Sequence, residues 1–386
     1  MACQDLVYHE PLKMTPSTPD IVPSDVLWEN LAHSRPQLLV RKWVSSLLCA
    51  GVVLLYTIPV SFASMLAQLD KLARTYPWLA WLDDLGPVSV AIIQGVLPPL
   101  LVGIMLVMIP PLIRKLAALQ GVLTGRARET LVQSWYFAFL FVQCFLVVTV
   151  SGGLSAFFSE LASEPGQAVN NLSKSLPKAA NYFFSYLTVQ ALSSSASALL
   201  QVGSLGDWLL LGPAVDSTPR QKWKRQEKLG EVRWGTMFPP LSNIATIGIV
   251  YSVIAPLMLI FMTFIFSLFW VVYRYNVLYV YRYDSDYGGL MFPTAVHQLF
   301  TGLYVLEACL AAYFFTVTSA SGHLLCVPQG VIMSLSLLAT GFFQWRMLLE
   351  TSQKIRSNEV QDKVEIARQT LQRLNMIRVS LTEVVS

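Results

Sequence analysis

The chain has 386 residues, of which 54% are hydrophobic and 13% are charged. A typical soluble domain carries about 25% charged residues, so this composition disfavours a soluble protein and is typical of a polytopic membrane protein. The net charge of +4 is small, and we expect no nucleic-acid partner. The five cysteines show neither the spacing of a disulfide framework nor that of a metal site, so we expect no metal and no cofactor.

Apolar stretches, each about long enough to cross a bilayer, follow one another along most of the chain. A hydrocarbon core of about 30 Å needs about 20 apolar residues in a helix. The sequence therefore predicts an all-α polytopic membrane protein with about eight transmembrane helices. The expected parts are a polar segment 1–42, a transmembrane domain 43–346 and an amphipathic tail 347–386. The expected spans are 43–66, 88–109, 131–157, 181–203, 241–255, 257–273, 298–317 and 324–345.

The basic residues lie almost entirely on one side of these spans. If both termini are cytosolic, all but four of the 27 basic residues face the cytosol. Because cytoplasmic loops of membrane proteins are enriched in lysine and arginine, we expect this orientation. The sequon that begins at Asn171 then lies outside, in a polar loop 159–178, where glycosylation can occur. We expect an integral protein of the plasma membrane or of an endomembrane.

The common enzyme motifs are absent from the sequence. It contains no G-x-S-x-G, H-E-x-x-H, C-x-x-C or G-x-x-x-x-G-K pattern, and its four histidines are far apart. We therefore expect no catalytic residues and no enzymatic activity.

Polar side chains recur inside the second to fifth apolar stretches. In the fourth stretch they are spaced by four and three residues, so they share one helix face. One interpretation is the wall of a hydrated pore or substrate path. The other is close packing of helices through small and hydrogen-bonding residues. The candidates for pore lining are Gln94, Gln143, Tyr186, Gln190, Ser194, Ser197 and Tyr251.

Glu307 is the one carboxylate well inside an expected span. In an antiparallel hairpin of the last two spans, Glu307 would lie at the depth of Ser334 and Ser336. A protonated Glu307 that is hydrogen-bonded there is a structural interpretation, and proton-coupled transport is the functional alternative.

Prolines interrupt two of the apolar runs. Pro98 and Pro99 lie in the second span, and Pro256 divides the run that holds the fifth and sixth spans. Proline removes a backbone hydrogen bond and kinks or breaks a helix. These three prolines are candidates for gating, and static kinks are the alternative.

Several motifs, in the same order along the chain, resemble one protein family. They are IQGVLPP at 93–99, YFFSYL at 182–187, VYSVIAPL at 250–257 and YRYNVLYVY at 273–281. They are similar to the OSCA family of osmosensing, stress-gated, calcium-permeable cation channels, over about residues 19–345, and the motifs look fungal. The resemblance implies an anoctamin-like channel fold that lacks, in this chain, the family's first three helices and its cytosolic domain.

The resemblance also implies a function. The pore helices of the family correspond to the first five spans, which places Gln94, Gln143, Tyr186 and Gln190 on pore helices, and the fourth span would be the main gating helix. It implies a mechanosensitive, non-selective cation channel that passes calcium and monovalent cations. Membrane lipids and a second copy of the chain are the expected partners. The alternative, by fold similarity to the anoctamins, is a lipid scramblase or lipid-handling protein.

Overall fold

The computed structural model describes residues 23–56, 108–146, 165–206, 216–227, 230–282, 291–316 and 326–350, with the single positions 149, 163, 208, 209, 212 and 289. These residues belong to two compact units. The larger unit is Leu27–Leu337 and contains the helices that concern function. The described residues of the smaller unit are the short 3-10 helix η1 (Pro23–Asp25), residue 26 and residues 338–350 at the end of the last helix.

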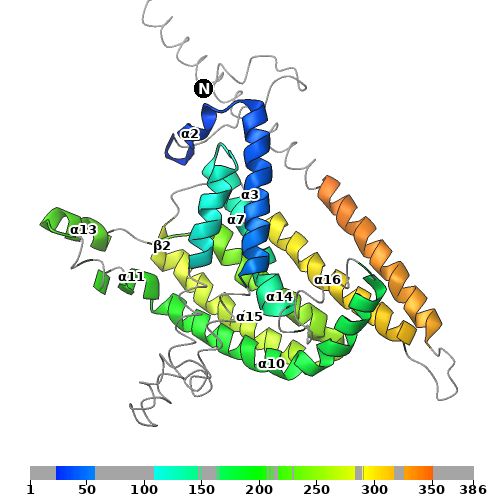
Figure 1. The fold of residues 1–386 in the computed structure, drawn as a ribbon. Coiled ribbons are helices and arrows are strands. Elements are labelled where there is room, and N and C mark those ends of the chain that lie inside the picture. Colours follow the sequence, from blue (N-terminus) through cyan, green and yellow to red (C-terminus); the bar gives the residue numbers. More distant parts are fainter. Residues whose placement is uncertain are drawn as a thin grey trace, which may run out of the picture. The chain divides into compact units, whose positions relative to one another are not determined.

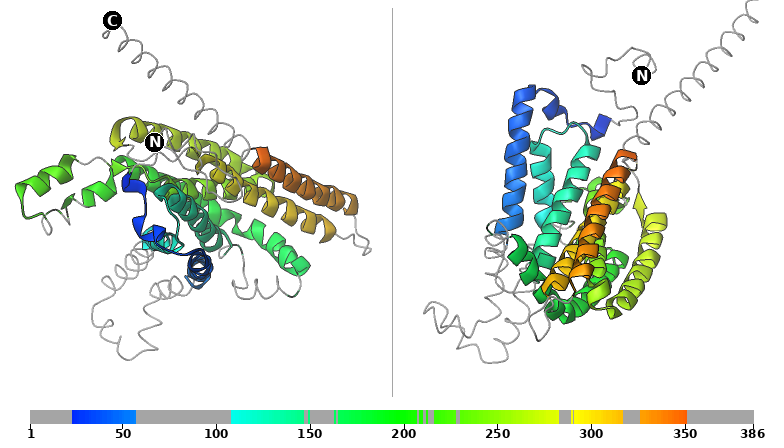
Figure 2. Two further views of the ribbon diagram at one scale, coloured as in Figure 1. Left: turned by 90° about the horizontal axis from the view of Figure 1, so that it is seen from above. Right: turned by 90° about the vertical axis from the view of Figure 1, so that its right-hand side faces the viewer.

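The described part of the larger unit is almost entirely helical, as Figures 1 and 2 show. A parallel pair of two-residue strands, β1 (Gly230–Glu231) and β2 (Tyr281–Arg282), is its sheet structure. This confirms the predicted all-α class. The helices are α2 (Trp28–Leu31), α3 (Arg35–Leu55), an unlabelled helix 108–119, α7 (Gly125–Leu140), α10 (Pro165–Leu199), α11 (Val202–Gly206), α13 (Pro219–Glu227), α14 (Trp234–Ile254), α15 (Leu257–Tyr275), α16 (Met291–Thr316) and a helix over Val327–Glu350. Two π-helices follow directly on others, η4 (Phe141–Leu146) after α7 and η6 (Asn276–Val280) after α15.

Within the described residues, five helices are long and apolar enough to cross a membrane. They overlap the first and the last four expected spans, and they are Pro36–Leu55, Trp234–Ile254, Leu257–Val280, Met291–Phe315 and Val327–Glu350. The second expected span, 88–109, lies outside the described residues except for its last two positions. The third and fourth expected spans correspond to α7 with η4 and to α10, and residues 147, 148 and 150–157 of the third lie outside the described residues.

The helices start earlier in the chain than the apolar stretches do. The first begins at Arg35 and not near Trp43, and α10 begins at Pro165 although its apolar part begins near Asn181. The loop expected over 159–178 was therefore wrong from Pro165 onward, and Asn171 lies exposed on a helix. The length of an apolar stretch indicates only the part of a helix that lies in the hydrocarbon core. Polar residues can extend the same helix beyond that part.

Helix α14 is the centre of the larger unit and packs against α7, α10, α15 and α16. Half of its most apolar window is buried, against 17% for the first span, so α14 is a core helix and α3 is a peripheral one. A side chain at Gly302 of α16 would lie 3.0 Å from the backbone oxygen of Thr246, so α14 and α16 approach closely because this residue is glycine. The long apolar run divides at Ala255 and Pro256, where proline cannot continue the hydrogen-bond ladder.

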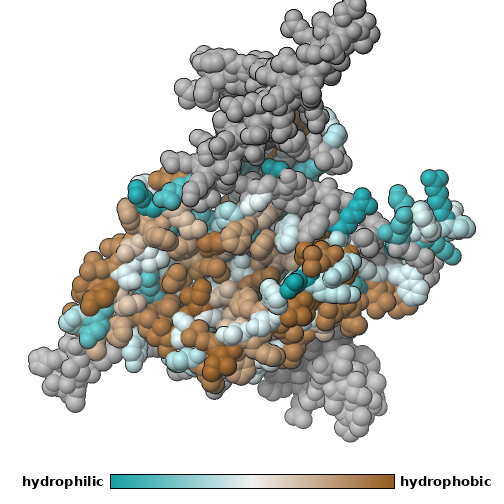
Figure 3. All heavy atoms as spheres, turned by 180° about the vertical axis from the view of Figure 1, so that it is seen from behind, coloured by the Kyte–Doolittle hydropathy of each residue, from teal (hydrophilic) through white to brown (hydrophobic). Residues whose placement is uncertain are grey.

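A second apolar cluster joins α3, the helix 108–119 and α7. Polar contacts also tie α3 and α2 to the helix 108–119 and the turn after it. The Ser45 hydroxyl donates to the Leu116 carbonyl at 2.6 Å, and the Asn30 amide donates to the carbonyls of Ala118 and Val122 at 3.1 and 2.8 Å. Figure 3 shows apolar side chains covering much of one face of the described helices, as lipid-facing helices require.

Candidate functional site

Helix α10 presents two different faces. Phe183, Leu187 and Ala191 are fully or almost fully buried in the core that α14, α15 and α16 share. Tyr186, Gln190 and Ser194 are only partly buried, and Ser197 is exposed. The four predicted polar residues therefore share a face of α10 that is less buried than the face of Phe183, Leu187 and Ala191, and Tyr186 packs against the margin of the core.

The π-helix η4 brings polar groups to this face. The Tyr186 hydroxyl lies beside the thiol of Cys144 in η4. The ring of Tyr186 also stacks on Tyr182, with centroids 5.9 Å apart and planes 10° from parallel. The residue before Cys144 is Gln143, whose side-chain amide donates to the Val53 carbonyl of α3 at 2.7 Å. Two consecutive residues of η4 thus reach α3 on one side and α10 on the other, and π-helical turns of this kind are frequent at functional sites.

Gln190 and Ser194 bond to each other along α10. The Gln190 amide nitrogen lies 3.3 Å from the Ser194 hydroxyl oxygen. This contact between residues four apart satisfies polar groups without a second helix. The pair therefore stays on the partly buried face of α10.

Tyr251 does not join this face. It is fully buried, its hydroxyl donates to the Leu176 carbonyl at 3.1 Å, and its ring centroid lies 5.1 Å from that of Phe183. Because Phe183 is on the core face of α10, the predicted grouping of Tyr251 with Tyr186 and Gln190 does not hold in this structure. The remaining pore candidate Gln94 lies outside the described residues, as do the gating candidates Pro98 and Pro99.

Glu307 of α16 is buried, with 6% of its surface exposed, and the Ser336 hydroxyl donates to its Oε1 at 3.0 Å. The expected contact with Ser336 is thus present. Ser334 instead donates to the Gly330 carbonyl of its own helix at 2.9 Å. This geometry agrees with the structural interpretation of Glu307.

The sequence reasoning missed a buried ion pair between the helix 108–119 and α7. The Arg114 guanidinium contacts both carboxylate oxygens of Glu129, at 2.7 and 3.2 Å, and Arg128 lies 3.8 Å from Oε1. Only 5% of the Glu129 side chain is exposed. The carboxylate lies close to Gly235 at the start of α14, where an added Cβ would be 2.7 Å from Oε2. The available signal was a single acid, Glu129, directly after a loop-like stretch with four bases at 114, 115, 126 and 128.

A second set of missed residues is polar and buried between α7 and α16. The Gln133 amide donates to the Met291 carbonyl at 3.0 Å, and the Gln298 amide donates to the Gln133 backbone carbonyl at 3.3 Å. In both contacts a side-chain amide of one helix bonds to the backbone of the other. This is what we expect if buried polar residues serve helix packing and do not line a pore. Across the ranges that the structure describes, no group of three or more histidine, cysteine or acidic side chains could hold a metal ion.

Apolar helices of membrane-spanning length, with polar side chains bonded between them, indicate an integral membrane protein. Residues 41–314 match the family described as "calcium-dependent channel, 7TM region, putative phosphate", and the chain belongs to this family. These matches confirm the resemblance seen in the sequence motifs.

Three relatives illustrate the family. RSN1 of Saccharomyces cerevisiae, an uncharacterized protein, is 36% identical over 81% of this chain and 33% of its own length. Phosphate metabolism protein 7 of the same yeast is 32% identical over 76% of this chain and 30% of its own length. The hyperosmolality-gated Ca2+ permeable channel 1.5 of Arabidopsis thaliana is 24% identical over 77% of this chain and 39% of its own length. The chain therefore spans about a third of the length of the relatives that it matches.

Proposed function

We propose that this chain forms the ion path of a calcium-permeable, non-selective cation channel that opens under membrane tension or osmotic stress. The observation that carries the proposal is the polar face of α10. Gln190 and Ser194 are only partly buried and bond to each other, and Tyr186, one turn before Gln190, packs at the margin of the core near Cys144 of η4. Membership of the family described as a calcium-dependent channel, and the similarity to a hyperosmolality-gated Ca2+ permeable channel of Arabidopsis, support it.

The chemistry of the face suits weakly selective conduction. Amide and hydroxyl oxygens of Gln143, Gln190 and Ser194 can replace part of the hydration shell of a cation. The described residues of the face include no carboxylate, so we propose that it passes monovalent cations as well as calcium, without strong selectivity for calcium. Where a carboxylate does lie within a described span, at Glu307, it bonds to a neighbouring helix instead.

The test of the path compares two matched serines. Ser194 lies on the proposed path, whereas Ser267 of α15 is exposed on an apolar helix and donates to the Thr263 carbonyl of its own turn at 2.7 Å. The purified full chain is reconstituted in liposomes and patch-clamped under suction and under osmotic stress. We expect Ser194→Leu to reduce the single-channel conductance and Ser267→Leu to leave it unchanged. An absence of current from the unsubstituted chain under both stimuli would refute the proposal.

Gating is tested with two matched tyrosines. Tyr186→Phe removes the hydroxyl beside Cys144 but keeps the aromatic ring, and Tyr251→Phe removes a hydroxyl in the packed core. If separation of α10 from η4 opens the path, Tyr186→Phe lowers the tension at which half the channels open. Tyr251→Phe should lower the thermal stability and leave that tension unchanged. Equal tension thresholds in the two variants and the parent chain would argue against opening at this contact.

Lipid scrambling is a second candidate because one observation favours it. Ser193 and Ser197 are exposed on α10 beside Val189 and Leu192, which are 66% and 52% exposed. Polar and lipid-facing surfaces are therefore neighbours on one helix, as a path for a lipid headgroup requires. A fluorescent-lipid assay in the same liposomes separates the two functions, because a channel alone passes ions and leaves the lipid asymmetric.

Dimerisation of the chain stays a prediction. It is tested by measuring the mass of the purified protein in detergent.

A further inference from the structure

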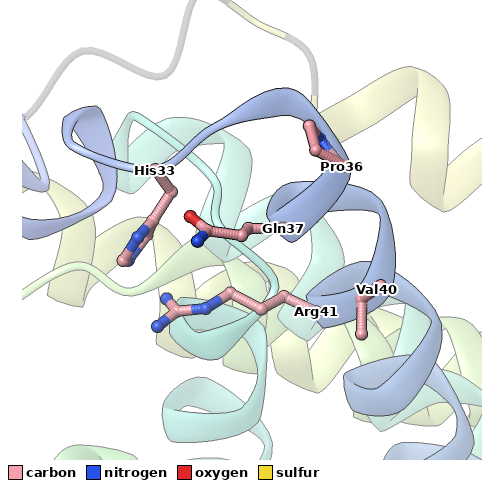
Figure 4. Close-up of a pocket in the computed structure, with 5 residues that line it drawn as sticks. All are labelled: His33, Pro36, Gln37, Val40 and Arg41. Atoms are coloured by element: carbon pink, nitrogen blue, oxygen red, sulfur yellow. The ribbon is translucent and has the colours of Figure 1, made fainter.

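A pocket of about 470 Å³ opens beside the first turns of α3. It is lined by His33, Pro36, Gln37, Val40 and Arg41. His33, Gln37 and Arg41 follow one another at intervals of four residues, and Figure 4 shows their imidazole, amide and guanidinium groups turned to the same side of the helix. Three nitrogen-bearing side chains therefore face one hollow.

The pocket offers hydrogen-bond donors. The Gln37 Oε1 accepts the Ser34 backbone N–H at 3.2 Å in a capping box, which leaves the Nε2 of Gln37 as a donor. Arg41 carries a permanent charge and five N–H donors, and none of the ion pairs of the described residues involves it. The described lining contains no acidic residue. Its chemistry therefore suits an anion with several oxygen acceptors, such as a phosphate group.

The surroundings of the pocket are apolar. Val40, Trp43 and Leu47 lie on one face of α3 and are 63%, 76% and 75% exposed. The span that begins at Pro36 is only 17% buried within the protein, so this face meets lipid. An exposed tryptophan at the end of a span is typical of the membrane–water interface. The pocket thus lies where a charged headgroup and an acyl chain can be bound together.

We propose that this pocket binds the phosphate of an anionic phospholipid, with His33, Gln37 and Arg41 as donors and the lipid chains along Val40, Trp43 and Leu47. A phospholipid fits better than a free anion because a free anion would leave the apolar surface beside the pocket unused. The site is separate from the polar face of α10, and its existence does not depend on whether the chain conducts ions.

The test uses two neighbouring bases. Arg41 lines the pocket, whereas Lys42 is exposed and does not belong to the described lining. The full chain in detergent is titrated with short-chain phosphatidic acid and, separately, with phosphatidylcholine, and bound lipid is counted by native mass spectrometry. We expect Arg41→Gln to weaken phosphatidic acid binding about five-fold, the effect of about one basic contact, while Lys42→Gln has no effect. Arg41→Lys keeps the charge but loses the planar guanidinium group. We expect its affinity for phosphatidic acid to lie between the affinities of Arg41→Gln and Lys42→Gln.

Several outcomes would overturn the proposal. Equal losses of phosphatidic acid affinity in Arg41→Gln and Lys42→Gln would show that the net charge of the protein alone attracts the lipid. Unchanged binding in Arg41→Gln, with the thermal stability of the parent chain, would show that the pocket is not the site. Displacement of the lipid by millimolar inorganic phosphate would identify a free anion as the occupant, and equal binding of phosphatidylcholine would identify a lipid site without charge recognition.

Discussion

The buried contact between Glu129 and Arg114 allows a quantitative prediction. Removing one partner of a buried, hydrogen-bonded ion pair costs about 3–5 kcal/mol because the other charge is left buried and unpaired. Here 18% of the Arg114 side chain stays exposed to solvent, so water can solvate it in part. We therefore expect Glu129→Gln to destabilise the protein by about 3 kcal/mol, at the low end of that range.

A third charged residue near this ion pair, Arg128, predicts which of the two single variants is less stable. Arg128 lies 3.8 Å from Glu129 Oε1, so Glu129 keeps a cationic neighbour when Arg114 is lost. Arg114→Gln should therefore cost less than Glu129→Gln, which leaves two arginines facing each other. The double variant Arg114→Leu with Glu129→Leu removes both charges and should recover part of the loss.

The assay is thermal unfolding of the purified chain in detergent, with the folded fraction that remains after heating measured by size-exclusion chromatography. The control is Asp216→Asn, which removes a second ion pair, with Arg225, that lies outside the candidate membrane spans. The reasoning would be refuted if Glu129→Gln destabilised the protein no more than this control. It would also be refuted if Arg114→Gln proved more harmful than Glu129→Gln.

Three further predictions concern other parts of the chain. Glu307→Gln keeps an acceptor for the neighbouring serine, so we expect normal current and stability, and loss of current at normal expression would favour the proton-coupled alternative. Gly302→Ala inserts a Cβ at 3.0 Å from a backbone oxygen and should cost about 1–3 kcal/mol in thermal unfolding. The control is Gly51→Ala, where no atom lies within 4 Å of the added Cβ, and it should be neutral or stabilising. Equal losses of stability in the two variants would contradict the close approach of α14 and α16 at Gly302. The hydrogen bond from Arg225 holds the pKa of Asp216 below its ordinary value of 3.8, so this pair stabilises the fold above that pH, and the stabilisation is lost as the pH falls through the lowered pKa. A carboxyl NMR titration should show the Asp216 pKa rising in Arg225→Gln, and an unchanged pKa would refute the assignment.

The membrane-spanning helices were predictable because the bilayer demands an apolar length that composition alone reveals. The contact of Glu307 with Ser336 was predictable for a related reason, since an antiparallel hairpin places residues at equal depth side by side. The extension of α10 back to Pro165 was not predictable in this way, because its first residues are polar and hydropathy does not separate a polar helix from a loop. The ion pair of Glu129 escaped notice because a basic loop reads as solvated until the fold buries it.

The difference between Tyr186 and Tyr251 shows what the sequence left open. Both are tyrosines in apolar helices, and both have polar neighbours, Cys144 for Tyr186 and the Leu176 carbonyl for Tyr251. Tyr186 is only partly buried at the margin of the core, whereas Tyr251 is fully buried within it. Helical periodicity assigns residues to faces of one helix, but only the arrangement of the neighbouring helices decides which face is covered.

The same arrangement indicates where the larger unit can move. Helix α14 is half buried and approaches α16 closely at Gly302, so separating these two helices would expose packed apolar surface. The contact of η4 with α10 is packed as well, because Phe145 is fully buried and its ring centroid lies 5.9 Å from that of Phe183. If the proposed path opens beside η4, its first step therefore has to break polar contacts at the margin of this packing, such as the hydrogen bond from Gln143 to the Val53 carbonyl. A neutral hydrogen bond contributes only about 1 kcal/mol, so such a step costs far less than pulling Phe145 away from Phe183.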